Sequence, residues 1–246
     1  MAPARILALD KDDLTKELGG LVIEAQNKAL ANKKYFDIGI SGGSQGPALA
    51  ATLLGNDAVK WSQWRVWLVD ERIVPLDHPD SNWALFQTHV LDKLPADHQP
   101  QGFPISKELL EKSKTETVPH TEFASDYQMK LVAVLGEQPK LDLALLGMGP
   151  DGHTCSLFPG HKLLQEDKLL VASLDDSPKP PPARITLTKP ALHLVDQIIF
   201  YAAGAAKKDA IHKIFTEEDT QFPTKQVIDI AKNPVVFLTD PAALGQ

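Results

Sequence analysis

Short apolar runs alternate along the chain with longer segments in which apolar residues recur every three or four positions. Leu143–Leu146 is continuously apolar, which is typical of a strand buried on both faces of a parallel sheet. Short runs of this kind predict strands at Arg5–Leu9, Phe36–Ser41, Arg65–Asp70, Leu141–Gly147, Leu169–Ser173, Arg184–Thr188, Gln197–Ala202, Gln226–Asp229 and Val235–Thr239. Helical spacing predicts helices at Lys11–Ala31, Gln45–Leu54, Asn82–Leu94, Thr121–Leu135 and Ala205–Phe215.

This alternation of strands and helices predicts an α/β fold, an open, doubly wound and mostly parallel sheet with helices on both faces. Two stretches interrupt the pattern. Pro95–Pro119 is polar and rich in proline, and we expect it to form an excursion beside the sheet. Ser177–Pro182 contains too many prolines for a helix or a central strand and should form a stiff loop. Neither stretch resembles a domain linker, so we expect one domain over residues 1–246.

The composition limits the kinds of partner and cellular location that we expect for the protein. The 246 residues carry a formal net charge of -7 without a block of lysine and arginine, which disfavours nucleic-acid binding. Cys155 is the only cysteine, so no intramolecular disulfide can form. No apolar run approaches the roughly 18 residues of a membrane span, and Met1–Arg5 does not begin a signal peptide. A cytoplasmic location is therefore expected.

Ligands of open α/β sheets bind at the carboxyl ends of the strands, so the segments that follow each predicted strand are the candidates for chemistry. Ser41–Pro47 follows the second strand and opens a helix. Its glycines allow close approach of a ligand, and the free amides of a helix start favour an anion such as phosphate. The same segment also fits the Gly-x-Ser-x-Gly pattern at Gly39–Gly43, which would make Ser41 a nucleophile. Both interpretations stay open at this point.

Two later segments carry ionisable groups at strand ends. Asp70–Pro75 places two carboxylates and a guanidinium where ligands bind, and Arg72 has the forked geometry that suits a phosphate. Gly147–Gly160 holds three glycines within six residues and then His153, which predicts a tight loop that presents an imidazole as a general base. Asp151 is placed to orient this histidine or to contact the substrate.

Arg184 and Lys207 complete the candidate set. Arg184 begins a strand after three prolines, and Lys207 lies at a strand-to-helix turn. Each can neutralise a phosphate, and each can equally be a solvated surface charge. No metal site is expected, because the chain has no His-Glu-x-x-His pattern and a single cysteine cannot build a thiolate site.

Taken together, these segments resemble the 6-phosphogluconolactonase family. The matching pieces occur in the order of the family and are Ser41–Ser44, Asp70–Pro75 with Ser81–Asn82, Gly147–Gly160, Pro180–Thr188 and Gly204–Lys207. Gln45–Gly46 and Cys155 depart mildly from the pattern of the family. The resemblance implies the modified Rossmann-like fold shared with glucosamine-6-phosphate deaminases and ribose-5-phosphate isomerases. It also implies hydrolysis of 6-phosphogluconolactone to 6-phosphogluconate, in the oxidative pentose phosphate pathway, without a cofactor.

The predicted catalytic residues are His153 and Asp151. The predicted substrate-binding residues are Ser41, Gly42, Gly43, Ser44, Asp70, Arg72, Gly149, Arg184 and Lys207. Two alternatives remain. The deaminase relatives carry a glutamate at the position of Phe158, and a phenyl ring cannot relay protons, which disfavours deamination or isomerisation. A non-catalytic sugar-phosphate sensor of the same fold is the other alternative. A monomer or a weak homodimer is expected.

Overall fold

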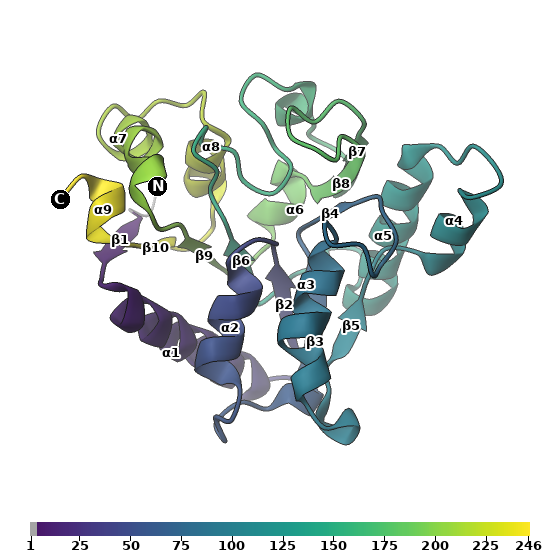
Figure 1. The fold of residues 1–246 in the computed structure, drawn as a ribbon, viewed down its shortest axis with the longest axis horizontal. Coiled ribbons are helices and arrows are strands. Elements are labelled where there is room, and N and C mark those ends of the chain that lie inside the picture. Colours follow the sequence, from purple (N-terminus) through teal and green to yellow (C-terminus); the bar gives the residue numbers. More distant parts are fainter. Residues whose placement is uncertain (1–3) are drawn as a thin grey trace.

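The computed structural model describes residues 4–246, and its centre is a seven-stranded sheet in which all neighbouring strands run parallel (Figure 1). In order across the sheet, the strands are β1 (Arg5–Ala8), β10 (Val236–Thr239), β9 (Gln197–Tyr201), β6 (Leu143–Leu146), β2 (Phe36–Ile40), β3 (Trp64–Leu68) and β5 (Gln101–Phe103). The predicted open, mostly parallel α/β fold is confirmed. Met1–Pro3, part of the stretch in which we expect no signal peptide, lies outside the described residues.

Helices cover both faces of the sheet, with α1, α2 and α3 on one side and α5, α6 and α8 on the other (Figure 1). Two tryptophans of β3 show how the faces are anchored. Trp64 donates from its indole nitrogen to Gln26 of α1 at 2.8 Å, whereas the Trp67 ring packs edge-on against Tyr127 of α5. Because they are three residues apart on a strand, these side chains point to opposite faces. The helices are α1 (Lys11–Leu30), α2 (Gln45–Leu53), α3 (Asn82–His89), α4 (Lys107–Lys112), α5 (His120–Leu135), α6 (Lys189–His193), α7 (Lys208–Phe215), α8 (Pro223–Ile230) and α9 (Pro241–Leu244).

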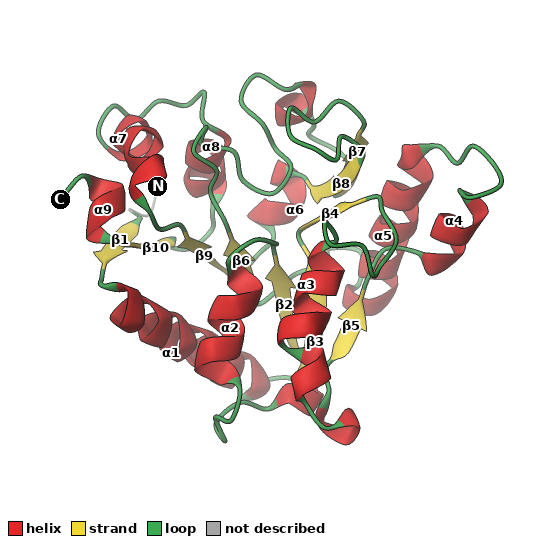
Figure 2. Ribbon diagram, in the orientation of Figure 1, coloured by secondary structure: helices red, strands yellow, loops and turns green. Residues whose placement is uncertain are grey.

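A second, three-stranded antiparallel sheet lies beyond the end of β3, seen as separate arrows in Figure 2. Its strands, in order, are β4 (Asp70–Arg72), β8 (Arg184–Leu187) and β7 (Val171–Leu174). Val69 joins the two sheets, since its amide donates to Ile40 of β2 and its carbonyl accepts from Leu187 of β8. The chain therefore passes from the main sheet to the small sheet within a single residue.

The small sheet corrects part of the sequence prediction. The expected strand Arg65–Asp70 is broken at Val69, and the expected strands Leu169–Ser173 and Arg184–Thr188 belong to the small sheet and not to the main one. The expected excursion Pro95–Pro119 contains β5, which adds an edge strand to the main sheet.

The predicted strand Gln226–Asp229 is wrong, because this segment lies inside helix α8. Pro223 begins the helix at a position where the missing amide costs nothing. Thr224, Val227 and Ile228 are buried, which is the spacing of one helical face. A four-residue window with two apolar residues, Val227 and Ile228, does not separate a strand from such a helix.

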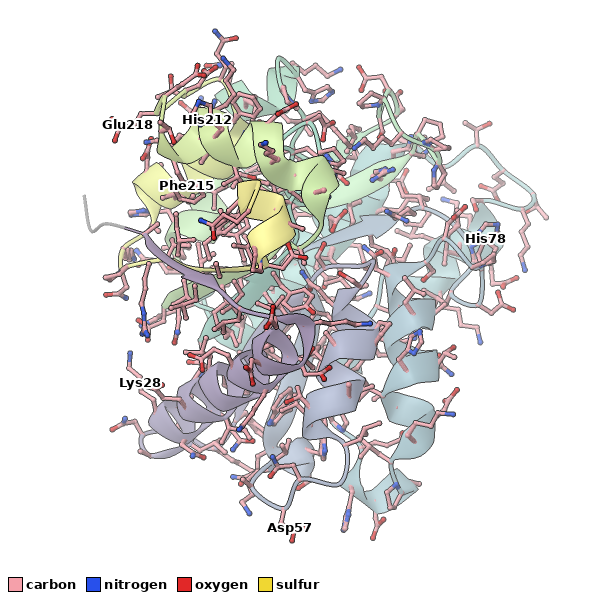
Figure 3. The ribbon with its side chains drawn as sticks, turned by 60° about the vertical axis from the view of Figure 1, so that its left-hand side comes forward. Lys28, Asp57, His78, His212, Phe215 and Glu218 are labelled. Carbon is pink, nitrogen blue, oxygen red and sulfur yellow. The ribbon has the colours of Figure 1, made fainter. Side chains whose placement is uncertain are left out.

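The C-terminal helices cover the β1 end of the sheet. Figure 3 views this end, with α7 and α9 above α1 and with Phe215 labelled on α7. The Phe215 ring packs edge-on against Phe237 of β10, with centroids 4.9 Å apart. Among residues 4–246, no helix is long and apolar enough to cross a membrane.

Candidate active site

The carboxyl ends of β9, β6, β2 and β3 meet at one cavity of about 280 Å³. Strand order reverses here, since the chain moves outward from β2 to β3 on one side and to β6 on the other, which is the usual ligand position in open α/β sheets. The cavity is lined by Ser41–Gln45, Asp70, Arg72, Asn82, Gly147–Pro150, His153, Cys155, Arg184, Tyr201–Ala203 and Lys207. Every predicted binding residue and His153 are in this lining. Asp151 is the one predicted site residue outside it, and it contacts His153 instead.

The turn Ser41–Ser44 leads from β2 into α2, and Ser44 is the N-cap residue of that helix. Its shape depends on two glycines. Gly43 has a φ of +68°, a conformation that side chains disfavour. A Cβ atom on Gly42 would overlap the side-chain amide of Asn82. The turn therefore brings the helix start close to the cavity, where backbone amides can bind an anion.

The buried carboxylate of Asp70 links three segments of the site. It accepts hydrogen bonds from Ser41 Oγ at 3.0 Å and from Ser156 Oγ at 2.9 Å, and the Asp70 carbonyl accepts from Asn82 Nδ2 at 2.8 Å. The Ser41 hydroxyl thus gives its proton to a carboxylate and not to a histidine. This geometry does not support the interpretation of Ser41 as a nucleophile, which requires a neighbouring base.

Glu71 fixes the start of α3 beside the cavity. Its fully buried carboxylate accepts from the backbone amides of Arg72, Asn82 and Trp83 and from the Ser81 hydroxyl. Burial raises the pKa of Glu71 to about 7, against the opposing effect of these four donors. The motif that includes Arg72 and Asn82 is therefore held in place by a carboxylate that does not itself line the cavity.

Arg72 and Arg184 lie directly opposite each other on β4 and β8. Arg184 is only 2% exposed. Three of its N–H groups donate to the carbonyls of Lys179–Pro181 and one donates to Ser156 Oγ. Within the described part of the chain, one of the five N–H groups of its guanidinium is therefore free for a ligand. Arg72 donates once, to the Asp80 carbonyl, and its buried Nε has no partner within residues 4–246. Burial and then the charge of Arg72 lower the pKa of Arg184. Of the two guanidinium groups, Arg72 keeps more donors for an anion.

The loop after β6 presents His153. Gly149 leaves room for the base, because a Cβ atom at this position would overlap the His153 ring. His153 Nδ1 lies 2.5 Å from Asp151 Oδ1. Burial lowers the pKa of His153, and the hydrogen bond to Asp151 offsets only part of that effect. Burial alone would raise the pKa of Asp151, but its bonds to His153 and Lys179 hold it at about 2. The pair is therefore a neutral imidazole and a carboxylate near neutral pH.

Lys207 approaches the cavity from the other side, after β9. It ends a short 3-10 turn, Ala205–Lys207, that follows Gly204 with a φ of +100°. Burial, followed by the nearby charge of Lys179, lowers the pKa of Lys207. Lys207 thus adds a cation to the cavity lining beside Arg72 and Arg184, while no cluster of three metal-binding side chains occurs within residues 4–246.

Three residues at the site make contacts that the sequence did not predict. Lys179 Nζ lies 3.1 Å from both Asp151 Oδ1 and His153 Nδ1. The Phe158 ring packs on His153, with centroids 4.8 Å apart, and Arg184 lies over the same ring. Gln45 accepts from the Ser41 amide at 2.9 Å. The signals in the sequence were a lysine inside the proline-rich loop, Phe158 at the position of the deaminase glutamate, and the departure of Gln45 from the family pattern.

The fold and the cavity define an α/β protein with a basic, histidine-containing site for a small anionic ligand. The family model of glucosamine-6-phosphate isomerases/6-phosphogluconolactonase matches residues 9–236. The chain belongs to this family, as its motifs predicted. A protein of Saccharomyces cerevisiae named 6-phosphogluconolactonase 3 is 38% identical over 96% of this chain and 94% of its own length. The human 6-phosphogluconolactonase is 40% identical over 94% of this chain and 89% of its own length.

Solved structures show the same relationship. The 6-phosphogluconolactonase of Trypanosoma brucei superimposes with a TM-score of 0.85 at 25% identity, covering 100% of this chain and 99% of that one. A monomeric glucosamine-6-phosphate deaminase superimposes with a TM-score of 0.75 at 16% identity. The deaminase shares the fold, as the resemblance implied.

Proposed function

We propose that the chain hydrolyses 6-phosphogluconolactone to 6-phosphogluconate, the lactone-opening step of the oxidative pentose phosphate pathway. Relatives named 6-phosphogluconolactonase, 38% to 40% identical over most of the chain, support this reaction. The observation that carries it in this chain is the His153–Asp151 pair, at the wall of a cavity otherwise lined by anion-binding groups.

His153 acts as the general base. With the Nδ1 proton donated to Asp151, the lone pair of the ring is on Nε2. Nε2 removes a proton from water as the water oxygen attacks the lactone carbonyl carbon. Backbone amides of the glycine-rich loops stabilise the tetrahedral oxyanion that forms. Its collapse breaks the bond to the ring oxygen, which takes the proton from the imidazolium, so His153 returns to its neutral form.

The phosphate of the substrate binds to other groups of the cavity lining. The Ser41–Ser44 turn supplies backbone amides and the Ser44 hydroxyl, and Arg72, Arg184 and Lys207 supply positive charge. These groups take no part in the bond changes at the carbonyl, so their binding energy positions the lactone against His153. Asp70 and Gly149 complete the substrate-binding set, Asp70 by fixing the Ser41 hydroxyl and Gly149 by leaving room beside the histidine ring.

Phe158 favours hydrolysis over deamination. Its ring contacts His153 at the place where the resemblance puts the glutamate of the deaminases. Ring opening and isomerisation of an amino sugar need a second group that moves a proton, and a phenyl ring cannot do so. Attack of water on a lactone needs one base, which His153 provides.

A coupled assay of lactone loss, with the spontaneous rate subtracted, tests the proposal. The wild-type protein should accelerate ring opening, and His153→Ala should lose about 10²-fold or more of kcat while product affinity, measured by calorimetry, stays within twofold or so. A protein that binds the product but does not accelerate ring opening would be a sensor. Lys207→Ala and Arg184→Ala should chiefly raise KM, and an unchanged KM would remove that residue from the phosphate site.

We further propose action in the cytoplasm on a free small molecule, as one domain that is a monomer or a weak homodimer and has no nucleic-acid partner. The net charge of -7 and the single cysteine support this setting. Size-exclusion chromatography with light scattering tests the oligomeric state.

A further inference from the structure

Lys179 reaches the base from outside the cavity lining. Its ammonium nitrogen lies 3.1 Å from Asp151 Oδ1 and 3.1 Å from His153 Nδ1, so three charged or polar groups meet at one point. The Lys179 side chain is 39% exposed, whereas that of His153 is 18% exposed. The ammonium therefore lies between solvent and the partly buried base.

The backbone of Lys179 is held rigidly. Its carbonyl accepts from Arg184 Nη2 at 2.9 Å and from the Ser177 hydroxyl at 2.8 Å, and its amide donates back to that hydroxyl. Arg184 also binds the next two carbonyls of this proline-rich stretch. The lysine is thus placed by the loop and not by chance contact of a mobile surface chain.

Only one arrangement of the hydrogen bonds among His153, Asp151 and Lys179 leaves Nε2 of His153 free to act as a base. His153 Nδ1 cannot donate to Asp151 and accept from Lys179 at the same time, because one nitrogen carries either the proton or the lone pair. When Nδ1 donates to Asp151, Lys179 donates to the same Asp151 oxygen. Asp151 then accepts hydrogen bonds from both His153 Nδ1 and Lys179 Nζ. The bond to Nδ1 holds the imidazole in the form whose lone pair is on Nε2.

We infer that Lys179 is a positioning residue of the general base: it partly neutralises Asp151, so that this carboxylate orients the His153 ring while making the imidazole less basic than an unpaired carboxylate would. The inference rests on the proposed function for its catalytic meaning. A carboxylate beside an imidazole favours the protonated ring, and a protonated ring cannot accept a proton from water. An ammonium at 3.1 Å from Nδ1 opposes that effect.

The other charges around the ring do not substitute for Lys179. Asp70, in the cavity lining, acts in the same direction as Asp151 and favours protonation of His153. Lys207 lies near Lys179 and Asp151, but no hydrogen bond joins it to either of them within residues 4–246. Arg184 lies over the Phe158 ring, against which the imidazole also packs, and its hydrogen bonds go to the carbonyls of Lys179–Pro181 and to Ser156. Lys179 is the cation in direct contact with the pair.

The test compares Lys179→Met, which removes the charge at similar length, with Lys179→Arg, which keeps it. The protonation midpoint of His153 is followed by NMR of the imidazole signals, assigned by their loss in a His153→Asn variant, so that the measurement does not depend on activity. In parallel, kcat/KM is measured against pH. Ionisation of the substrate phosphate near pH 6 is the same for each variant, so a difference between variants belongs to the protein.

We expect Lys179→Met to raise the NMR midpoint of His153, and the acid limb of kcat/KM, by about half a unit to one unit. Lys179→Arg should stay near the wild type. Lys179→Gln is the second neutral variant, for use if the methionine protein does not fold, and should show the same upward shift. Lys162→Met, an exposed lysine 3.9 Å from Asp176, is the matched control and should shift neither quantity.

An unchanged or lowered NMR midpoint in both neutral variants would overturn the inference, as would a rise in KM alone, which would make Lys179 a phosphate ligand. Absence of lactone hydrolysis by the wild-type protein would overturn the proposed function. The NMR midpoints would still decide whether Lys179 controls the protonation of His153.

Discussion

Replacing Gly149 by alanine should damage catalysis by displacing the base. Gly149 lies outside the left-handed region, so its backbone accepts an alanine, and its amide keeps its bond to the His153 carbonyl. The added Cβ atom would overlap Nδ1 and Cε1 of His153 and crowd Asp151 Oδ1. The nearest atoms that the substitution meets therefore belong to the base and its partner.

The size of the effect follows from the overlap. Non-bonded heavy atoms need about 3.5 Å, and the Cβ atom falls so far inside this distance that the ring must move by about 1 Å or more. A displacement of that size costs on the order of 10²-fold in rate. Since each factor of ten is about 1.4 kcal/mol, the transition state loses about 2.7 kcal/mol of stabilisation.

The assay is kcat at saturating lactone, with spontaneous opening subtracted, alongside thermal unfolding of each protein. Gly147→Ala is the comparison in the same loop, because its Cβ atom meets only Gln45 Nε2, at 3.8 Å, and it should lose much less activity. If folded Gly149→Ala keeps kcat within about threefold of the wild type, less than the general-base contribution, the position of His153 is not critical and the reasoning fails.

Three further outcomes are expected. Because burial holds the pKa of His153 below 6.5, kcat should stay constant as the pH falls through 6.5 and decline only below it; a midpoint at or above 6.5 would contradict the burial. Asp151→Asn removes a charge that raises this pKa, so the acid limb should move to lower pH while kcat falls by about 10²-fold; a limb that moves upward would refute the assignment. Asp37→Ala leaves Arg65 and the Trp67 indole nitrogen without their shared partner. Urea unfolding should show that the free energy of unfolding falls by about 3 kcal/mol. A fall of less than about 1 kcal/mol would mean that the buried Asp37–Arg65 pair contributes no more than a surface ion pair.

The local parts of the site could be predicted from sequence. The turn Ser41–Ser44 and the loop that carries His153 are each built by a few consecutive residues, and their glycines already show where the backbone must turn sharply. Their position at the same edge of the sheet followed from the rule that parallel strands end together. The order of strands and helices was also predicted over most of the chain, because the hydrophobic patterns that indicate them are local.

The parts that depend on distant pairing could not be predicted. The register of β4 against β8 places Arg72 opposite Arg184, and nothing in either segment specifies the other as partner. Lys179 lies in a proline-rich loop whose sequence does not indicate a contact with His153. The position of the loop depends on Arg184, which donates to its carbonyls. The strand prediction at Gln226–Asp229 is wrong because the burial of Val227 and Ile228 comes from the packing of α8, which a window of four residues does not show.

Val69 joins the two sheets through its own amide and carbonyl, so a shift of one sheet against the other would break backbone bonds that no solvent replaces. One wall of the cavity is built on the small sheet and the other on the main sheet. The backbone hydrogen bonds of Val69 therefore fix the distance between the two walls. If the two walls keep this spacing when a ligand binds, selectivity rests on a preformed shape, and binding spends little free energy on ordering the protein.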